Sequence, residues 1–211
     1  YLARATRMRL PSWMIRDQAL FMSGLLVDSI GGQPVKPYQP EGIWEEATFG
    51  KIKYEQDHGD ALYRRSLYTF WRRISGPTFL FDNSSRQVCN VKMLNTNTPL
   101  HALTTLNDIT YTEAARVMAE KIITSENTDE DRLTYAFEWA TSRQPAPEEL
   151  RILKNRLADL RTEFSSNPEE AQKIISVGEY PVNAGIDRAE YATYAVLSSL
   201  LLNLDETITR Q

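Results

Sequence analysis

The stretch "PEELRILKNRLADLRTEF", residues 147–164, decides the fold class of this 211-residue chain. Pro147 suits the first turn of a helix, where its missing N–H would have no partner in any case. Capping residues precede or follow the neighbouring segments in the same way. They are Thr128 before 129–143, Asn167 with Pro168 and Glu170 before 169–177, Gly178 after that segment, and Asp187 with Glu190 before 188–204. Residues 111–211 are therefore expected to form a helical array.

Short helices and loops are expected in the first half of the chain. The pattern predicts a helix over Pro11–Ser29, stopped by Gly31-Gly32, and another over Ala61–Arg73. Residues 33–60 lack a sustained period, but their aromatic residues favour an ordered loop held on the core. The segment "TFLF" (78–81) could form a short strand.

The polar residues in the stretch 98–108 are expected to cap helices. Thr98 and Pro99 open a helix over 99–107, and Asp108 caps the next one. The expected fold is mainly α, an irregular helical array with a long ordered loop region and at most a minor short strand pair. We expect a single helical domain over 1–211, with a motif-rich part at 1–110 and the array at 111–211.

The bulk composition excludes several classes of protein. Apolar residues make up 42% and charged residues 25%, as in ordinary globular proteins. The net charge of −4 gives no global field that would recruit nucleic acid. No apolar run reaches the roughly 18 residues of a membrane helix. The single cysteine, Cys89, excludes an internal disulfide and haem attachment, so no cofactor is expected in this chain.

Familiar catalytic signatures are absent: the sequence has no G-x-G-x-x-G, P-loop, H-E-x-x-H or G-x-S-x-G. The segment "EQDHGD" (55–60) nevertheless offers Asp57, His58 and Asp60 as candidate metal ligands. Ligands from elsewhere would be His101, Asp82 or Asp108. The structural alternative is a solvated acidic turn.

His101 is the second of the two histidines, and it lies in the predicted 99–107 helix. A general base at His101 would be held by a carboxylate such as Asp108. The candidate catalytic residues are therefore His101, Asp108 and His58. The alternative is a half-buried imidazole bonded to backbone.

The arginine doublets Arg64-Arg65 and Arg72-Arg73 are the sharpest electrostatic feature. In a helix, Arg65 and Arg72 would share one face and Arg64 would lie beside Tyr68. Arginine makes two-pronged contacts with phosphate, sulfate or carboxylate, so these four residues are candidate anion-binding residues.

The other candidate binding residues are Tyr38, Trp44 and Asn97. The alternative for the arginines is pairing inside the fold with Asp17, Asp57, Asp60 or Asp82, a role that Arg16-Asp17 also suits.

Five segments, in order, resemble the planctomycete-specific domain of unknown function found at the C-terminus of planctomycete cytochrome-c-like proteins. They are "RLPSWMIRDQAL" with "SGLL", "IGGQPVKPYQPEGIWEEATFG", "YEQDHGDALYRRSLYTFWRR", "FDNSSRQVC" and "TNTPLHALTTLND". The resemblance covers nearly the whole chain, as the C-terminal portion of that domain. One departure is Asn95, where family members tend to carry Arg.

The resemblance implies a piece of a longer, extracytoplasmic polypeptide that carries haem c elsewhere, and it supplies no catalytic residue. Our first hypothesis is a helical module that docks on neighbouring domains of the same polypeptide. The alternatives are a metal-assisted enzyme domain and an anion- or glycan-binding domain acting on a polysaccharide. Motifs converging on one open cleft would favour the enzyme, whereas motifs joined to one another inside the fold would favour the module.

Overall fold

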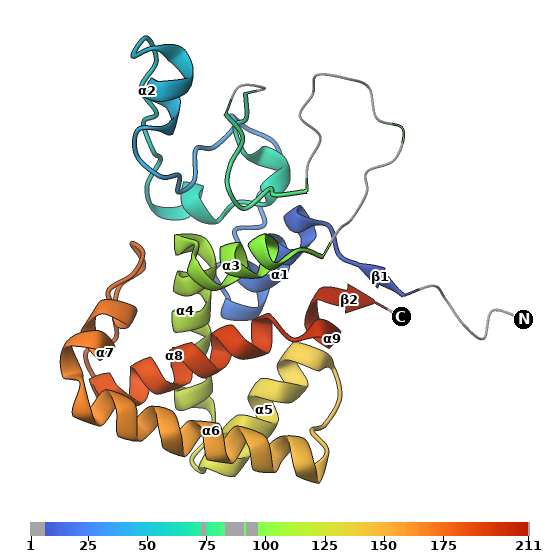
Figure 1. The fold of residues 1–211 in the computed structure, drawn as a ribbon, viewed down its shortest axis with the longest axis vertical. Coiled ribbons are helices and arrows are strands. Elements are labelled where there is room, and N and C mark those ends of the chain that lie inside the picture. The colour runs from blue at the N-terminus through green and yellow to red at the C-terminus, as the bar shows by residue number, and fades with distance from the viewer. Residues whose placement is uncertain (1–6, 73–74, 83–90, 92–96, 211) are drawn as a thin grey trace, which may run out of the picture.

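The computed structural model describes residues 7–72, 75–82, 91 and 97–210. The expectation of a mainly α fold is confirmed (Figure 1). The α-helices are α1 (Ser12–Ser23), α2 (Ile43–Thr48), α3 (Pro99–Asn107), α4 (Ile109–Ser125), α5 (Asp129–Thr141), α6 (Pro147–Ser166), α7 (Pro168–Ile175), α8 (Arg188–Leu202) and α9 (Asp205–Ile208). Two 3₁₀ turns, η1 (Gly59–Tyr63) and η2 (Ser66–Tyr68), and an antiparallel pair, β1 (Met8–Arg9) with β2 (Thr209–Arg210), complete the fold.

Helix α4 is the centre of the core. It packs along α8 more extensively than any other described pair of elements, and α1 covers another side of it (Figure 1). Its small residues Ala114 and Ala119 are fully buried, which lets neighbouring helices approach closely. Tyr191 and Tyr194 of α8 are fully buried as well. A membrane-spanning helix is not found among the residues that the structure describes.

Side-chain caps begin three of the described helices, α4, α5 and α8. The side chains of Asp108, Thr128 and Asp187 accept hydrogen bonds from backbone N–H groups two or three residues later, at 2.9–3.2 Å. Two expected caps differ. Thr98 holds the N-cap position of α3 without a side-chain cap bond. Asn167 instead donates its amide to the Glu163 carbonyl at 3.0 Å, at the end of α6.

Helix α1 is shorter than expected. It ends at Ser23 because Gly24 adopts a left-handed conformation and donates its N–H to the Phe21 carbonyl, while Leu26 N–H reaches back to Leu20. This double closure terminates a helix firmly. At the other end, Asp82 accepts from Ser12 N–H at 2.9 Å, so a carboxylate distant in sequence caps the first turn.

Residues 61–73 were expected to form a helix, and that expectation is wrong for the described residues. The 3₁₀ turns η1 and η2 are separated by extended residues, because the backbone here bonds to distant segments. Val27 N–H donates to Tyr63, and Val35 N–H donates to Tyr68. The segment "TFLF" is likewise a turn and not a strand, with Phe79 fully buried.

The long loop over residues 33–60 is ordered and contains its own short helix, α2, which lies at the far end of the molecule from α5 and α6 (Figure 1). Trp44 anchors it, with only 2% of its surface exposed. Its ring stacks between Tyr54 and Phe70, at centroid distances of 5.4 and 5.8 Å. Trp44 and Tyr54 therefore anchor this loop as expected, whereas Phe49, another aromatic residue expected to do so, is 94% exposed.

Candidate functional site

Arg16 contacts several of the sequence motifs in the first half of the chain. Its guanidinium is fully buried in α1 and donates to the carbonyls of Leu62 at 2.8 Å and Arg64 at 2.9 Å. It also lies 4.6 Å from the ring centroid of Phe79. Burial lowers the pKa of Arg16, and Asp17 at 3.7 Å opposes that shift. These contacts fix the η1–η2 segment against α1.

Other motif residues make similar connections. Asp17 accepts from the Ser66 N–H at 2.8 Å and from its hydroxyl at 2.7 Å. Arg64 is largely buried and donates to the carbonyls of Ser29 and Gln33 at 3.1 and 3.0 Å. Each of these bonds joins two segments that are separate in the sequence.

The arginine doublets are therefore divided by the fold. Arg64 lies 4.0 Å from the Tyr68 ring centroid, as expected, although no helix places it there. Arg65 is half-exposed and pairs with Asp28 at 2.5 Å. Arg72 is exposed, and without a helix it shares no helical face with Arg65. Arg73, Cys89 and Asn95 lie outside the described residues.

A second polar network, centred on Glu113 and Arg116 of α4, was not anticipated. Both side chains are fully buried. Glu113 accepts from the Tyr63 hydroxyl at 2.9 Å and the Tyr180 N–H at 2.7 Å. Arg116 donates to the Tyr180 carbonyl at 2.6 Å. Burial and then the Glu113 carboxylate raise the pKa of Tyr63, which keeps its hydroxyl protonated as a donor.

The only sequence signal for this network was a charged pair inside the small apolar run "EAARVMA" (113–119). Tyr38, a candidate binding residue, belongs to its margin, because its hydroxyl accepts from the Glu179 N–H at 2.8 Å. Tyr38 and Trp44 are both buried, so neither ring presents a face to solvent.

The candidate metal ligands have separate partners. Asp57 accepts from Lys36 N–H at 2.7 Å, and His58 lies 2.6 Å from a carboxylate oxygen of Glu179. Asp60 is exposed. Across the described residues, no group of three or more His, Cys, Asp or Glu side chains is arranged to hold a metal ion. The structure therefore does not bring these three residues together as one ligand set.

The candidate catalytic residues His101 and Asp108 are also engaged in the fold. His101 is buried and stacks on Phe81, with 4.3 Å between ring centroids. Asp108 accepts from the Thr78 hydroxyl at 2.8 Å as well as capping α4. Asn97, a candidate binding residue, is exposed just before α3. His58, in contrast to His101, has a largely exposed side chain.

Helix α3 has the opposite of the usual amphipathic arrangement. Its buried residues are polar, namely His101 and Thr105. Its outer side carries Leu100, Leu103 and Leu106, which are 70%, 55% and 41% exposed. Because these leucines are three residues apart, they form one stripe, which we call the leucine face. A helix of an isolated soluble domain normally turns its apolar stripe inward.

Comparison with family models gives one match. Residues 1–157 match the family described as "PSD1: Protein of unknown function (DUF1553)". The chain belongs to this family. Comparisons with curated proteins and with solved structures find no match. The PSD1 match ends inside α6, so α7 and α8 lie beyond the matched residues.

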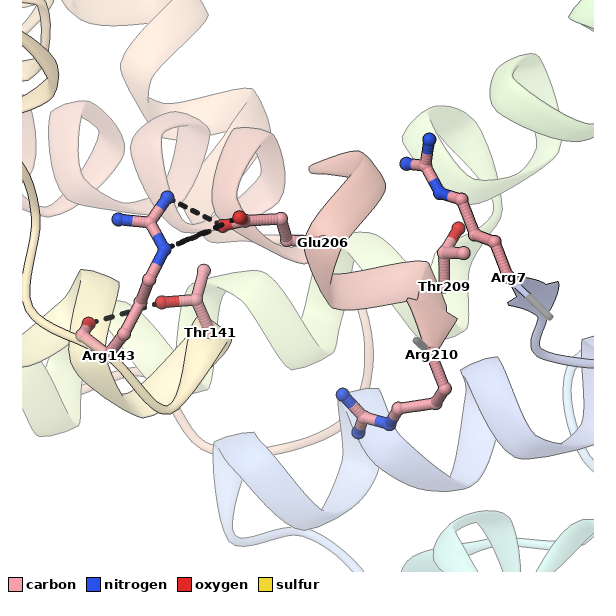
Figure 2. A pocket seen from close by; sticks show the side chains of 6 residues that line it. All are labelled: Arg7, Thr141, Arg143, Glu206, Thr209 and Arg210. Carbon is pink, nitrogen blue, oxygen red and sulfur yellow. Dashed lines mark hydrogen bonds and ion pairs between the residues drawn. The ribbon is translucent and has the colours of Figure 1, made fainter. Parts of the chain in front are cut away.

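This PSD1 chain has a second exposed surface beside α1. A groove of about 390 Å³, the α1 groove, is lined by Leu10, Met14, Phe21 and Leu26, and by the polar residues Asp17, Gln18, Arg65 and Arg210. Figure 2 shows the neighbouring pocket, of about 230 Å³. There Arg143 bonds Glu206, whereas Arg210 points away from both.

Arg16, Asp17 and Arg64 thus connect sequence motifs inside the fold. Other candidate residues are exposed, namely Arg65, Arg72, His58, Asp60 and Asn97. The described pockets do not unite His58 and His101 in one lining. The leucine face is an apolar surface, whereas the α1 groove is lined by apolar and polar residues alike.

Proposed function

We propose that this PSD1 chain is a non-catalytic docking module that binds another domain of the same polypeptide through the leucine face of α3. One observation carries the proposal: α3 buries His101 and Thr105 and exposes Leu100, Leu103 and Leu106. Ile109, at the start of α4, extends the apolar stripe and is 42% exposed. A contiguous exposed apolar patch in a soluble protein marks an interaction site.

The energetics support an apolar partner surface. Complete burial of a leucine side chain contributes about 1.5–3 kcal/mol. Three leucines in one stripe could therefore supply much of the binding energy of a modest interface, which a few central residues usually dominate. The buried polar side chains, His101 and Thr105, hold α3 in place and leave the leucines free to contact the partner.

The remaining parts of the proposal follow from the family resemblance. The partner is a domain related to cytochrome c, and the polypeptide works outside the cytoplasm. Purification of the complete polypeptide should then give a haem absorption band, and cell fractionation should recover it outside the cytoplasm. A polypeptide without haem, or one recovered in the cytoplasm, would contradict these parts while leaving the leucine face to be tested separately.

The docking test uses Leu103→Asp, with Ile152→Asp as the control, because Ile152 is equally exposed at 55% but lies on α6. Calorimetry would measure binding of the neighbouring domain to each variant. Leu103→Asp should weaken binding about 30-fold or more, since central interface residues contribute about 2 kcal/mol or more. Equal affinities for the two variants, both folded, would reject the leucine face as the docking surface.

A further inference from the structure

Three aromatic side chains form a row on the surface between α1 and α5. Tyr135 and Trp139 are four residues apart on α5, so they share one face of that helix. The Trp139 ring lies 6.3 Å from Tyr135 and 6.1 Å from Phe21 of α1, with interplanar angles of 12° and 16°. We call these three residues the aromatic row.

Two rings of the row are exposed, whereas Tyr135 is partly buried against the core, and the row is held in position. Phe21 and Trp139 are 59% and 36% exposed. The Trp139 indole N–H donates to the Met22 carbonyl at 3.0 Å, which fixes the ring plane. Centroid separations above 6 Å are those of displaced rings, so each ring leaves part of its face uncovered. Phe21 therefore offers the most open ring of the row, and Trp139, with the Lys121 ammonium over its ring, is the less exposed ring beside it.

Hydrogen-bonding and cationic groups lie beside this row. Phe21 also lines the α1 groove, together with Gln18 and Arg210. The Lys121 ammonium lies 4.4 Å from the centroid of the Trp139 ring. Among the described residues, no carboxylate pairs with Arg210 or Lys121. Arg65 pairs with Asp28. Asp17, the carboxylate that lines the groove, lies 3.7 Å from Arg16. Arg210 and Lys121 are therefore cations of this surface to which the described residues give no carboxylate partner.

We propose that the aromatic row and the α1 groove together bind an acidic linear polysaccharide. Sugar rings stack on Phe21 and Trp139, since the apolar face of a pyranose matches an aromatic ring. Carboxylate or sulfate groups on the sugars bind Arg210, whose planar guanidinium makes two-pronged contacts with such anions, and Lys121. This surface involves other elements than the leucine face, so it adds a second recognition function to docking.

Single-stranded nucleic acid is the main competitor, because bases also stack on aromatic side chains next to cations. The net charge of −4 disfavours long polyanions of both kinds, so the ligand must place its anionic groups locally at Arg210 and Lys121. An acidic polysaccharide fits better, since it combines apolar ring faces with anionic groups that two cations can match.

The test is calorimetry of the complete chain with hexagalacturonate and with a sulfated hexasaccharide. These two probes distinguish carboxylate from sulfate as the anionic group. Cellohexaose and a thymidine oligonucleotide serve as the uncharged and nucleic-acid probes. At least one acidic oligosaccharide should bind, and binding should weaken with added salt because charge pairing contributes.

Two variants locate the binding surface. Phe21→Ala should weaken binding roughly 3- to 10-fold, as expected for the loss of one aromatic contact. Arg210→Gln, at an exposed position, should reduce both the affinity and its salt dependence. Phe49→Ala is the control, because Phe49 is 94% exposed elsewhere, at the end of α2. The proposal is rejected if neither acidic probe binds, if cellohexaose or the oligonucleotide binds as tightly, or if Phe21→Ala behaves like Phe49→Ala.

Discussion

The side chain of Glu113 occupies the space that a Cβ atom at residue 178 would need. Gly178 also has a φ of +86°, a conformation that side-chain-bearing residues rarely adopt. The buried network on α4 thus depends on a glycine 65 positions later. Other glycines of this chain have a similar φ but no atom close to an added Cβ. Comparing substitutions at the two kinds of position therefore separates backbone strain from steric overlap.

Gly178→Ala should lower the free energy of unfolding by about 3 kcal/mol, because it adds overpacking to backbone strain. Gly24→Ala should lower it by only about 1 kcal/mol, since Gly24 has nearly the same φ, +87°, but open space around the added Cβ. Urea denaturation of both variants measures the difference. Equal losses would mean that Glu113 moves aside freely.

Asp17→Ala should destabilise the fold by about 1–3 kcal/mol, because the Ser66 N–H would lose its acceptor. Arg65→Ala should change stability by less than about 1 kcal/mol, since its pair with Asp28 is solvent-exposed. Thermal melts of the two variants under the same conditions provide the comparison. A larger loss for Arg65→Ala would contradict the division of the arginine doublets between buried and exposed roles.

Substitutions of the two histidines should change the stability of the fold by different amounts. His101→Ala should lower stability by about 1–2 kcal/mol, because it removes a buried ring that stacks on Phe81. His58→Ala should stay within about 0.5 kcal/mol of the parent, as its side chain is largely exposed. Chemical denaturation checks both values. A His101→Ala variant with unchanged stability would reopen a catalytic role for that side chain.

Acidification should weaken the link between α6 and α9. Hydrogen bonds from Arg143, and then from the Ala146 N–H, lower the pKa of Glu149 to about 2. Arg143 also bonds Glu206 of α9 at 2.7 Å. A carboxyl group whose pKa is lower in the folded state stabilises the fold above its unfolded pKa, near 4.3, and this contribution disappears as the pH falls toward 2.

The measurement is the difference in melting temperature between the parent chain and Glu149→Gln. That difference should be small, because the pair is solvent-exposed, and it should be larger at pH 7 than at pH 2.5. High salt should also reduce it. A difference that grows on acidification would contradict the lowered pKa.

The sequence predicted what local interactions determine. Asp108, Thr128 and Asp187 cap their helices as expected, because a cap involves only neighbouring residues. Residues 61–73 were misassigned for the opposite reason. Their carbonyls receive the buried Arg16, which lies more than 40 positions earlier, and no local period records such a contact.

The candidate site residues stay predictions, whereas the fold class is confirmed. The polar motif residues were identified, but burial decides their roles, and burial depends on the assembled fold. Tyr38 and Trp44 were chosen as binding aromatics and are buried, whereas Phe21 and Trp139 are exposed. The sequence also could not show that α3 turns its leucines outward, because a stripe of leucines on a helix usually predicts a buried face.

The packing of α4 against α8 has a consequence for synthesis of the chain. About 77 residues separate the end of α4, Ser125, from the end of α8, Leu202. At roughly 5–20 residues per second, a ribosome needs ~4–15 s to add them. During that time the alanine-lined side of α4, with buried Glu113 and Arg116, has no α8 to cover it. The nascent chain must therefore expose its future core until α8 has been synthesised, which makes this interval one in which a chaperone would be needed.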